Sequence, residues 1–229
     1  VENASLMPWL TATALVHSLV VTEKRRLFNS MSILLAIISF SLSLLGTFLV
    51  RSGILISVHS FASDPTRGMF ILMLLGFFTG GALVLYSLKL KKDRRLRLKI
   101  FSRESLLLLN NVFLCTASGL ILIGTLYPML VELFDAGKLS VGPPYFNFVF
   151  LIPFLPMLFF MGWGVFSTWK NSELKDLISR TKWIFIISIL LSIIVTFAVY
   201  NYSGLLTFVG ITLAGWTILT GSIPFIKNL

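Results

Sequence analysis

The sequence predicts an all-α, polytopic integral membrane protein, a helical bundle of about seven transmembrane helices. Of its 229 residues, 56% are hydrophobic and only 12% are charged, and the mean hydropathy is +0.93. Apolar stretches of about 20 residues, the length of a helix that crosses the hydrocarbon core, recur along the chain. We expect a single transmembrane domain over residues 1–229.

Seven predicted spans follow one another with short connections. They cover residues 5–22, 31–50, 69–88, 105–127, 146–168, 183–200 and 204–225. Pro8 falls near the start of the first span, where a missing N–H is tolerated. Pro153 and Pro156 fall inside the fifth span, where prolines are expected to kink or delay a helix. The last two spans are joined by a few residues around Tyr202 and form a tight hairpin.

The basic residues set the expected orientation. Sixteen of the 19 Lys and Arg residues fall on one side of the predicted membrane, in three loops and after the last span. These inner loops are 23–30, 89–104 and 169–182. The other side carries Arg51, Arg67 and Lys138. The positive-inside rule therefore predicts that the N-terminus is outside and the C-terminus inside, with outer loops 51–68 and 128–145.

The absence of charged residues from the predicted spans and the small number of zinc-ligating residues argue against several classes of function. No span contains Asp, Glu, Lys or Arg, which ion-coupled transporters and proton pumps usually place at that depth. Two histidines and the single Cys115 cannot supply four ligands to zinc. The basic run 89–99 has no interleaved aromatic residues, so the net charge of +10 indicates anionic membrane lipid and no nucleic acid.

His17 is the only histidine inside a predicted span. It lies about 12 residues into that span, roughly 18 Å below the outer surface at ~1.5 Å per residue. A polar residue in hydrocarbon is costly and usually functional. The imidazole can hydrogen-bond a neighbouring helix, or it can ligate the metal of a buried cofactor, and the residues alone leave both open. Trp9 lies on roughly the same helix face, as a cofactor contact or an interfacial anchor.

His59 falls in the outer loop 51–68, within a stretch that is apolar for a loop. The stretch is consistent with an amphipathic segment at the interface whose imidazole points outward, and also with an ordinary exposed loop histidine. His17 and His59 are expected at different depths, so they cannot ligate the same iron. If both are ligands, each serves a separate haem whose second ligand comes from outside this chain or whose second position is open.

Four stretches resemble the CcmF family, the large haem-handling subunit of the cytochrome c maturation system of bacteria and plant mitochondria. They are VENASLMPWL at 1–10, the run 11–25 that contains His17, residues 48–62 that contain His59, and the motifs within 124–147. The order and spacing are specific to about residue 150, and the remainder matches in hydropathy. In the family, Trp-Asp-Pro precedes VENAS, so we expect a fragment that begins within the tryptophan-rich motif.

The resemblance implies site residues and cofactors. It makes His17 an axial ligand of a buried b-type haem, and His59 an axial ligand of a haem held transiently at the outer surface. The candidate contacts of the outer haem platform are Glu2, Asn3, Trp9 and Arg51. Arg51 fits either a haem propionate or a lipid headgroup. No catalytic residue is assigned.

The resemblance also implies a function. The family positions and reduces haem for covalent thioether attachment to apocytochrome c outside the membrane, as part of a haem lyase complex. The implied partners are the haem chaperone CcmE, CcmH- and CcmI-type subunits, apocytochrome c and membrane lipid. The implied location is the bacterial inner membrane, with the mitochondrial inner membrane as the alternative. A transporter of haem or another small molecule, and a non-catalytic scaffold of the complex, stay open.

Overall fold

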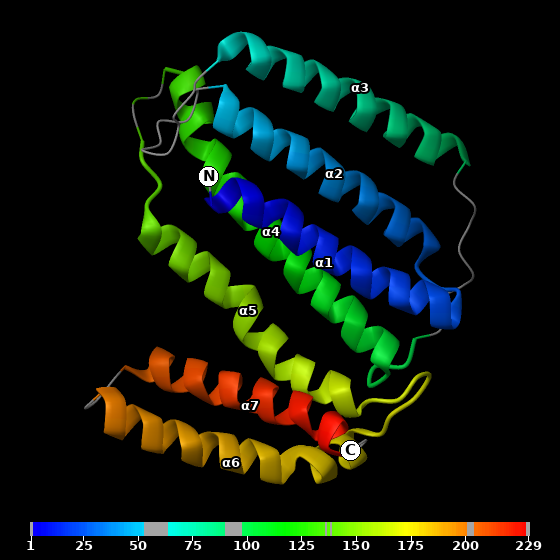
Figure 1. Ribbon diagram of the computed structural model, residues 1–229, viewed down its shortest axis with the longest axis vertical. Helices are drawn as coiled ribbons and strands as arrows, with labels where there is room; N and C mark the ends of the chain where they lie inside the picture. Colours follow the sequence, from blue (N-terminus) through cyan, green and yellow to red (C-terminus); the bar gives the residue numbers. More distant parts are fainter. Residues whose placement is uncertain are drawn as a thin grey trace. The chain divides into compact units, whose positions relative to one another are not determined.

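The computed structural model describes residues 2–52, 64–89, 98–135, 137, 139–200 and 204–227, which form seven long helices and no strand. The helices are α1 (Glu2–Arg25), α2 (Asn29–Arg51), α3 (Pro65–Lys89), α4 (Arg103–Leu133), α5 (Pro143–Phe166), α6 (Leu174–Tyr200) and α7 (Leu205–Lys227) (Figure 1). Each contains a stretch that is long and apolar enough to cross a membrane. The predicted all-α, seven-span fold is therefore confirmed.

Two helices extend beyond their predicted spans, α6 through a polar segment and α4 by less than two turns. α6 begins at Leu174 rather than near residue 183, and its first turn carries Asp176, whose charge favours a helix N-terminus. α4 continues through Pro128 to Leu133, past the predicted end at residue 127. Hydropathy marks the part of a helix that lies in hydrocarbon, so it does not report these polar or interfacial turns.

α5 is not delayed by its internal prolines. It begins at Pro143, where a residue without an N–H loses no intrahelical hydrogen bond, and it runs through Pro153 and Pro156 to Phe166. Each internal proline removes one backbone hydrogen bond, a loss that membrane helices tolerate when neighbouring groups satisfy the freed carbonyl.

The helices form two compact units. The first unit comprises residues 1–96 and 111–153, and the second comprises residues 97–110 and 154–229. Within the first unit, α2 packs against both α1 and α3 (Figure 1). Within the second, α6 packs against α7. All candidate site residues that the structure describes belong to the first unit.

The second unit has its own buried interior. The side chain of Glu104 is 1% exposed, and both of its carboxylate oxygens accept from the backbone N–H of Lys170 at 3.1 Å. Trp216, also 1% exposed, donates through Nε1 to the carbonyl of Phe159 at 2.9 Å and lies against Gly162, where a Cβ would collide with the indole. The Glu104 contact holds the start of α4, and the Trp216 contacts join the middle of α7 to α5.

Candidate functional site

One face of α1 is buried and forms the framework of the site. Its fully buried apolar side chains recur every three or four residues, the spacing of one helix face, and are Met7, Leu10, Ala14 and Val21. Trp9, which is 60% exposed, lies away from that face. His17 lies at the boundary between the two faces, because the residue is partly exposed while its Nδ1 atom is buried.

α4 lies antiparallel to α1 within the first unit. Near the N-terminus of α1, Nδ2 of Asn3 donates to Oγ1 of Thr125 at 3.5 Å. The number of residues from Asn3 to His17 on α1 equals the number from Thr125 back to Asn111 on α4. Since both helices rise by the same amount per residue, this pairing sets His17 and Asn111 at the same level.

The carboxamide of Asn111 is the polar neighbour of the His17 imidazole. The two side chains nevertheless stop short of hydrogen-bond geometry. Nδ1 of His17 and both polar atoms of the Asn111 side chain are buried without a hydrogen-bond partner among the residues that the structure describes. Such groups are rare in folded proteins, and each one requires an explanation.

A cluster of hydroxyl groups fixes α1 just below His17. Oγ of Ser18 lies 2.8 Å from Oγ of Ser32 on α2, and Oγ1 of Thr22 lies 3.1 Å from the same atom. Oγ1 of Thr22 also donates to the carbonyl of Leu27 in the connection between the two helices, at 2.7 Å. Because Ser18 follows His17 directly, these contacts hold the rotation of α1 at the histidine.

The N-terminal half of α1 and the C-terminal half of α2 meet at a glycine. A Cβ on Gly46 would lie 2.5 Å from the carbonyl oxygen of Ala4, so only a hydrogen atom fits between the helices. Pro8 has no N–H and cannot give the Ala4 carbonyl its usual intrahelical hydrogen bond. That carbonyl faces the Cα–H of Gly46 instead, a weak hydrogen bond that recurs where helices cross closely.

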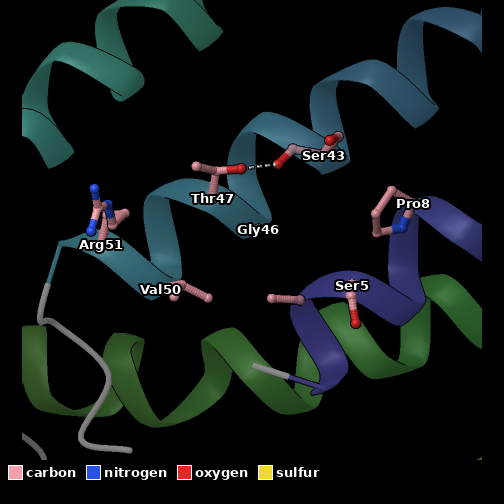
Figure 2. A pocket seen from close by; sticks show the side chains of 8 residues that line it. Ser5, Pro8, Ser43, Gly46, Thr47, Val50 and Arg51 are labelled. Atoms are coloured by element: carbon pink, nitrogen blue, oxygen red, sulfur yellow. Dashed lines mark hydrogen bonds between the residues drawn. The ribbon is translucent and has the colours of Figure 1, made fainter. Parts of the chain in front are cut away.

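A pocket of ≈ 450 Å³ lies beside this crossing, and its walls come from α1 and α2 (Figure 2). It is lined by Ala4, Ser5, Pro8, Ser43, Gly46, Thr47, Val50 and Arg51. Figure 2 shows Ser5 and Pro8 on α1, and Arg51 on the last turn of α2. One cation beside small and hydroxyl-bearing side chains suits an amphiphilic group with an anionic end.

The motifs at 124–128 and 142–147 contact each other. Tyr145 lies against Gly124, where a Cβ would collide with the tyrosine ring, and its hydroxyl donates to the carbonyl of Leu120 at 3.0 Å. The glycine of one motif therefore makes room for the tyrosine of the other. The two motifs have a structural role, because their contacts pack the start of α5 against α4 within the first unit.

The remaining candidates divide between the described and the undescribed parts of the chain. Glu2 is exposed in the first turn of α1. His59 lies outside the described residues, so its expected role stays a prediction.

Asn111 was not among the site residues predicted from the sequence. The sequence does show that an amide lies inside an apolar span. Such an amide is expected to make a polar contact, but the sequence does not show which helix provides the partner.

Comparisons with known proteins agree with the resemblance. A family model described as "Cytochrome C assembly protein" matches residues 1–56. The chain is 47% identical over 224 residues to the cytochrome c-type biogenesis protein CcmF of Pseudomonas fluorescens, covering 96% of this chain and 33% of that protein. It is 44% identical over 217 residues to CcmF of Escherichia coli, covering 94% of this chain and 34% of the relative.

A solved structure of the "Cytochrome c Heme Lyase CcmF" matches 99% of this chain and 33% of its own, with a TM-score of 0.71 and 25% identity. The chain spans about one third of the length of the curated relatives that it matches. Its seven apolar helices and its bacterial relatives make it a multi-pass inner-membrane protein. Over the third of their length that it spans, the chain is homologous in sequence and similar in fold to the CcmF cytochrome c biogenesis proteins.

Proposed function

We propose that this chain is the haem-positioning part of a cytochrome c haem lyase. It holds a buried b-type haem through His17, and it helps to hold a second haem at the outer surface for attachment to apocytochrome c. The observation that carries the proposal is the His17 imidazole, partly exposed on a membrane-spanning helix whose other face is packed.

The residues around His17 fit an axial ligand. The buried atom of the ring is Nδ1, and the ring as a whole is partly exposed, so Nε2 is the nitrogen left for the metal. A neutral imidazole is the form that ligates iron, and an apolar helix face favours that form. The hydroxyl contacts of Ser18 and Thr22 orient the helix that carries the ring.

The second haem would be held at the outer end of the first unit. Arg51, at the edge of the pocket, pairs with a haem propionate, and the contact between Asn3 and Thr125 fixes the start of α1 beneath the platform. Glu2 and Trp9 are exposed there and can contact the haem or its carrier. His59 would provide an imidazole nitrogen to the iron of this second haem.

The proposed chemistry belongs to the cofactor, and the protein provides binding and orientation. When bound, the buried haem supplies a one-electron relay that keeps the outer iron ferrous, and the outer haem supplies the vinyl groups to which two thiols of apocytochrome c add. This chain separates the two sites and keeps charged side chains out of its spans. The haem chaperone CcmE, CcmH- and CcmI-type subunits and apocytochrome c are the proposed partners.

Substitution of His59 tests this function. In the complete protein, His59→Ala is expected to abolish holocytochrome c formation while protein level and buried haem persist. His59→Cys is expected to retain part of the yield because thiolate also ligates haem iron, whereas His59→Lys fails because an ammonium has no lone pair. The measurement is holocytochrome c yield for all three variants. A yield restored by Lys alone would identify a salt bridge and reject ligation.

The same preparation separates the alternative functions. A complete protein that purifies without haem would be a scaffold, and an absorption spectrum detects this. Haem flux into liposomes without attachment to apocytochrome c would indicate a transporter. Buried haem that is reduced by quinol analogues supports the lyase.

The orientation of the chain is a further expected outcome. We expect the loops 51–68 and 128–145 outside, because sixteen of the 19 Lys and Arg residues lie in the opposite loops or after the last helix. Cysteines introduced at Ser60 and Lys138 should react with an impermeant maleimide in intact cells, after Cys115 has been replaced by serine. A cysteine at Lys175 is the control and should react only after permeabilisation. The reverse pattern would overturn the orientation.

A further inference from the structure

Three buried polar atoms on facing helices of the first unit have no partner among the described residues. They are Nδ1 of His17 and the two polar atoms of the Asn111 side chain. Asn111 is only 3% exposed. A buried amide or imidazole nitrogen that is left unpaired is costly, so an arrangement that pairs these groups is strongly favoured.

The two side chains are held at the same level by contacts that involve neither of them. Outside the pair, Asn3 bonds to Thr125, and Oγ of Ser118 on α4 donates to the carbonyl of Met7 on α1 at 3.2 Å. With the rotation of α1 fixed by Ser18, the imidazole and the carboxamide remain opposite each other. A change of side-chain torsion is enough to bring them into hydrogen-bond contact.

The direction of that hydrogen bond follows from the chemistry of the groups. A carboxamide presents one acceptor oxygen, and a neutral imidazole presents one N–H donor. If Nδ1 carries the hydrogen and donates to Oδ1 of Asn111, the lone pair is left on Nε2. Histidines that ligate metals almost always donate their other ring N–H to such an acceptor, which fixes the tautomer and raises the basicity of the ligand.

We propose that Asn111 is a positioning residue for His17, whose Nδ1–H it accepts so that Nε2 is directed at the haem iron. This inference rests on the proposed function, since it concerns the same site. Asn111 does not touch the metal. It acts on the orientation and on the electron density of the ring, and therefore on the redox potential of the haem.

The test compares two substitutions of opposite sense in the haem-loaded, complete protein. Asn111→Leu keeps the branched shape of the side chain but removes the acceptor, so the midpoint potential should rise and the haem affinity should fall about tenfold. Asn111→Asp supplies a stronger acceptor, so the ring becomes more electron-rich and the potential should fall below that of the wild type. The readouts are a potentiometric titration of the b-type haem and the low-spin ferric EPR spectrum.

The matched control is Asn110→Leu. The side chain of residue 110 leaves the same helix about 100° away from that of Asn111, so the same loss of an amide should leave the potential unchanged. Equal shifts for the two leucine variants, shifts of the same sign for Asn111→Leu and Asn111→Asp, or no shift would each overturn the proposal.

His17→Ala separates this inference from the proposed function. If His17→Ala keeps the buried haem, His17 is not the ligand and the proposed site fails. If His17→Ala loses the haem while both Asn111 variants keep the wild-type potential and EPR spectrum, the site stands and only the role of Asn111 is rejected.

Discussion

Replacing His17 with alanine in the complete protein is expected to remove the buried b-type haem and to leave the membrane fold in place. Alanine has no nitrogen to offer the iron, whereas the packing of α1 depends on Met7, Leu10 and Ala14, which the substitution does not touch. We expect the stability of the protein to change by about 1 kcal/mol, the typical effect of a single substitution.

The reduced-minus-oxidised spectrum of the purified protein measures the result. Val16→Ala is the matched control, because Val16 lies on the same helix, is 58% exposed and should keep the full Soret band. Thermal unfolding of both variants shows whether the fold persists. An undiminished Soret band in His17→Ala would eliminate His17 as a ligand, and equal losses in both variants would indicate a general effect of altering α1.

Gly46→Ala is expected to separate α1 from α2 and to destabilise the protein by about 3 kcal/mol, the upper end of the usual cost of overpacking a tight interior. The added methyl group would lie 2.5 Å from the carbonyl oxygen of Ala4. The backbone of α1 cannot change its torsion angles to avoid the methyl group as a flexible side chain can. The two helices must therefore move apart. The pocket beside the crossing would change shape at the same time.

Gly80→Ala on α3 is the matched control, since a Cβ there meets nothing within 4 Å. It removes the same conformational freedom and should be neutral or stabilising by up to about 1 kcal/mol, the difference in helix propensity. The apparent melting temperature of the detergent-solubilised protein checks both variants. A Gly46→Ala protein as stable as Gly80→Ala would show that the helices do not depend on this close approach.

The helices could be predicted from the sequence, but the contacts between helices that are distant along the chain could not. A span is a local property, because about 20 apolar residues suffice to identify it. The contact between Asn3 and Thr125 depends on which helices become neighbours, and hydropathy carries no such information. For the same reason, nothing in the sequence pointed to His17 as the neighbour of the Asn111 amide.

The connection between α1 and α2 illustrates a different limit. Arg26 and Phe28 adopt positive φ angles of 53° and 65°, a conformation uncommon for residues other than glycine, and Phe28 is only 3% exposed. No glycine, asparagine or proline marks this turn. It forms because Phe28 is buried and because Thr22 bonds to the carbonyl of Leu27, which is tertiary packing overriding local preference.

The contacts of α1 at Asn3 and at Ser18 make the length of this helix segment invariant. One inserted residue between them would shift every later side chain by about 1.5 Å along the axis and about 100° around it. The imidazole would then leave its place opposite α4, even though no contacting residue had been altered. The external loops can therefore gain or lose residues as the protein diverges, while α1 must preserve its helical phase.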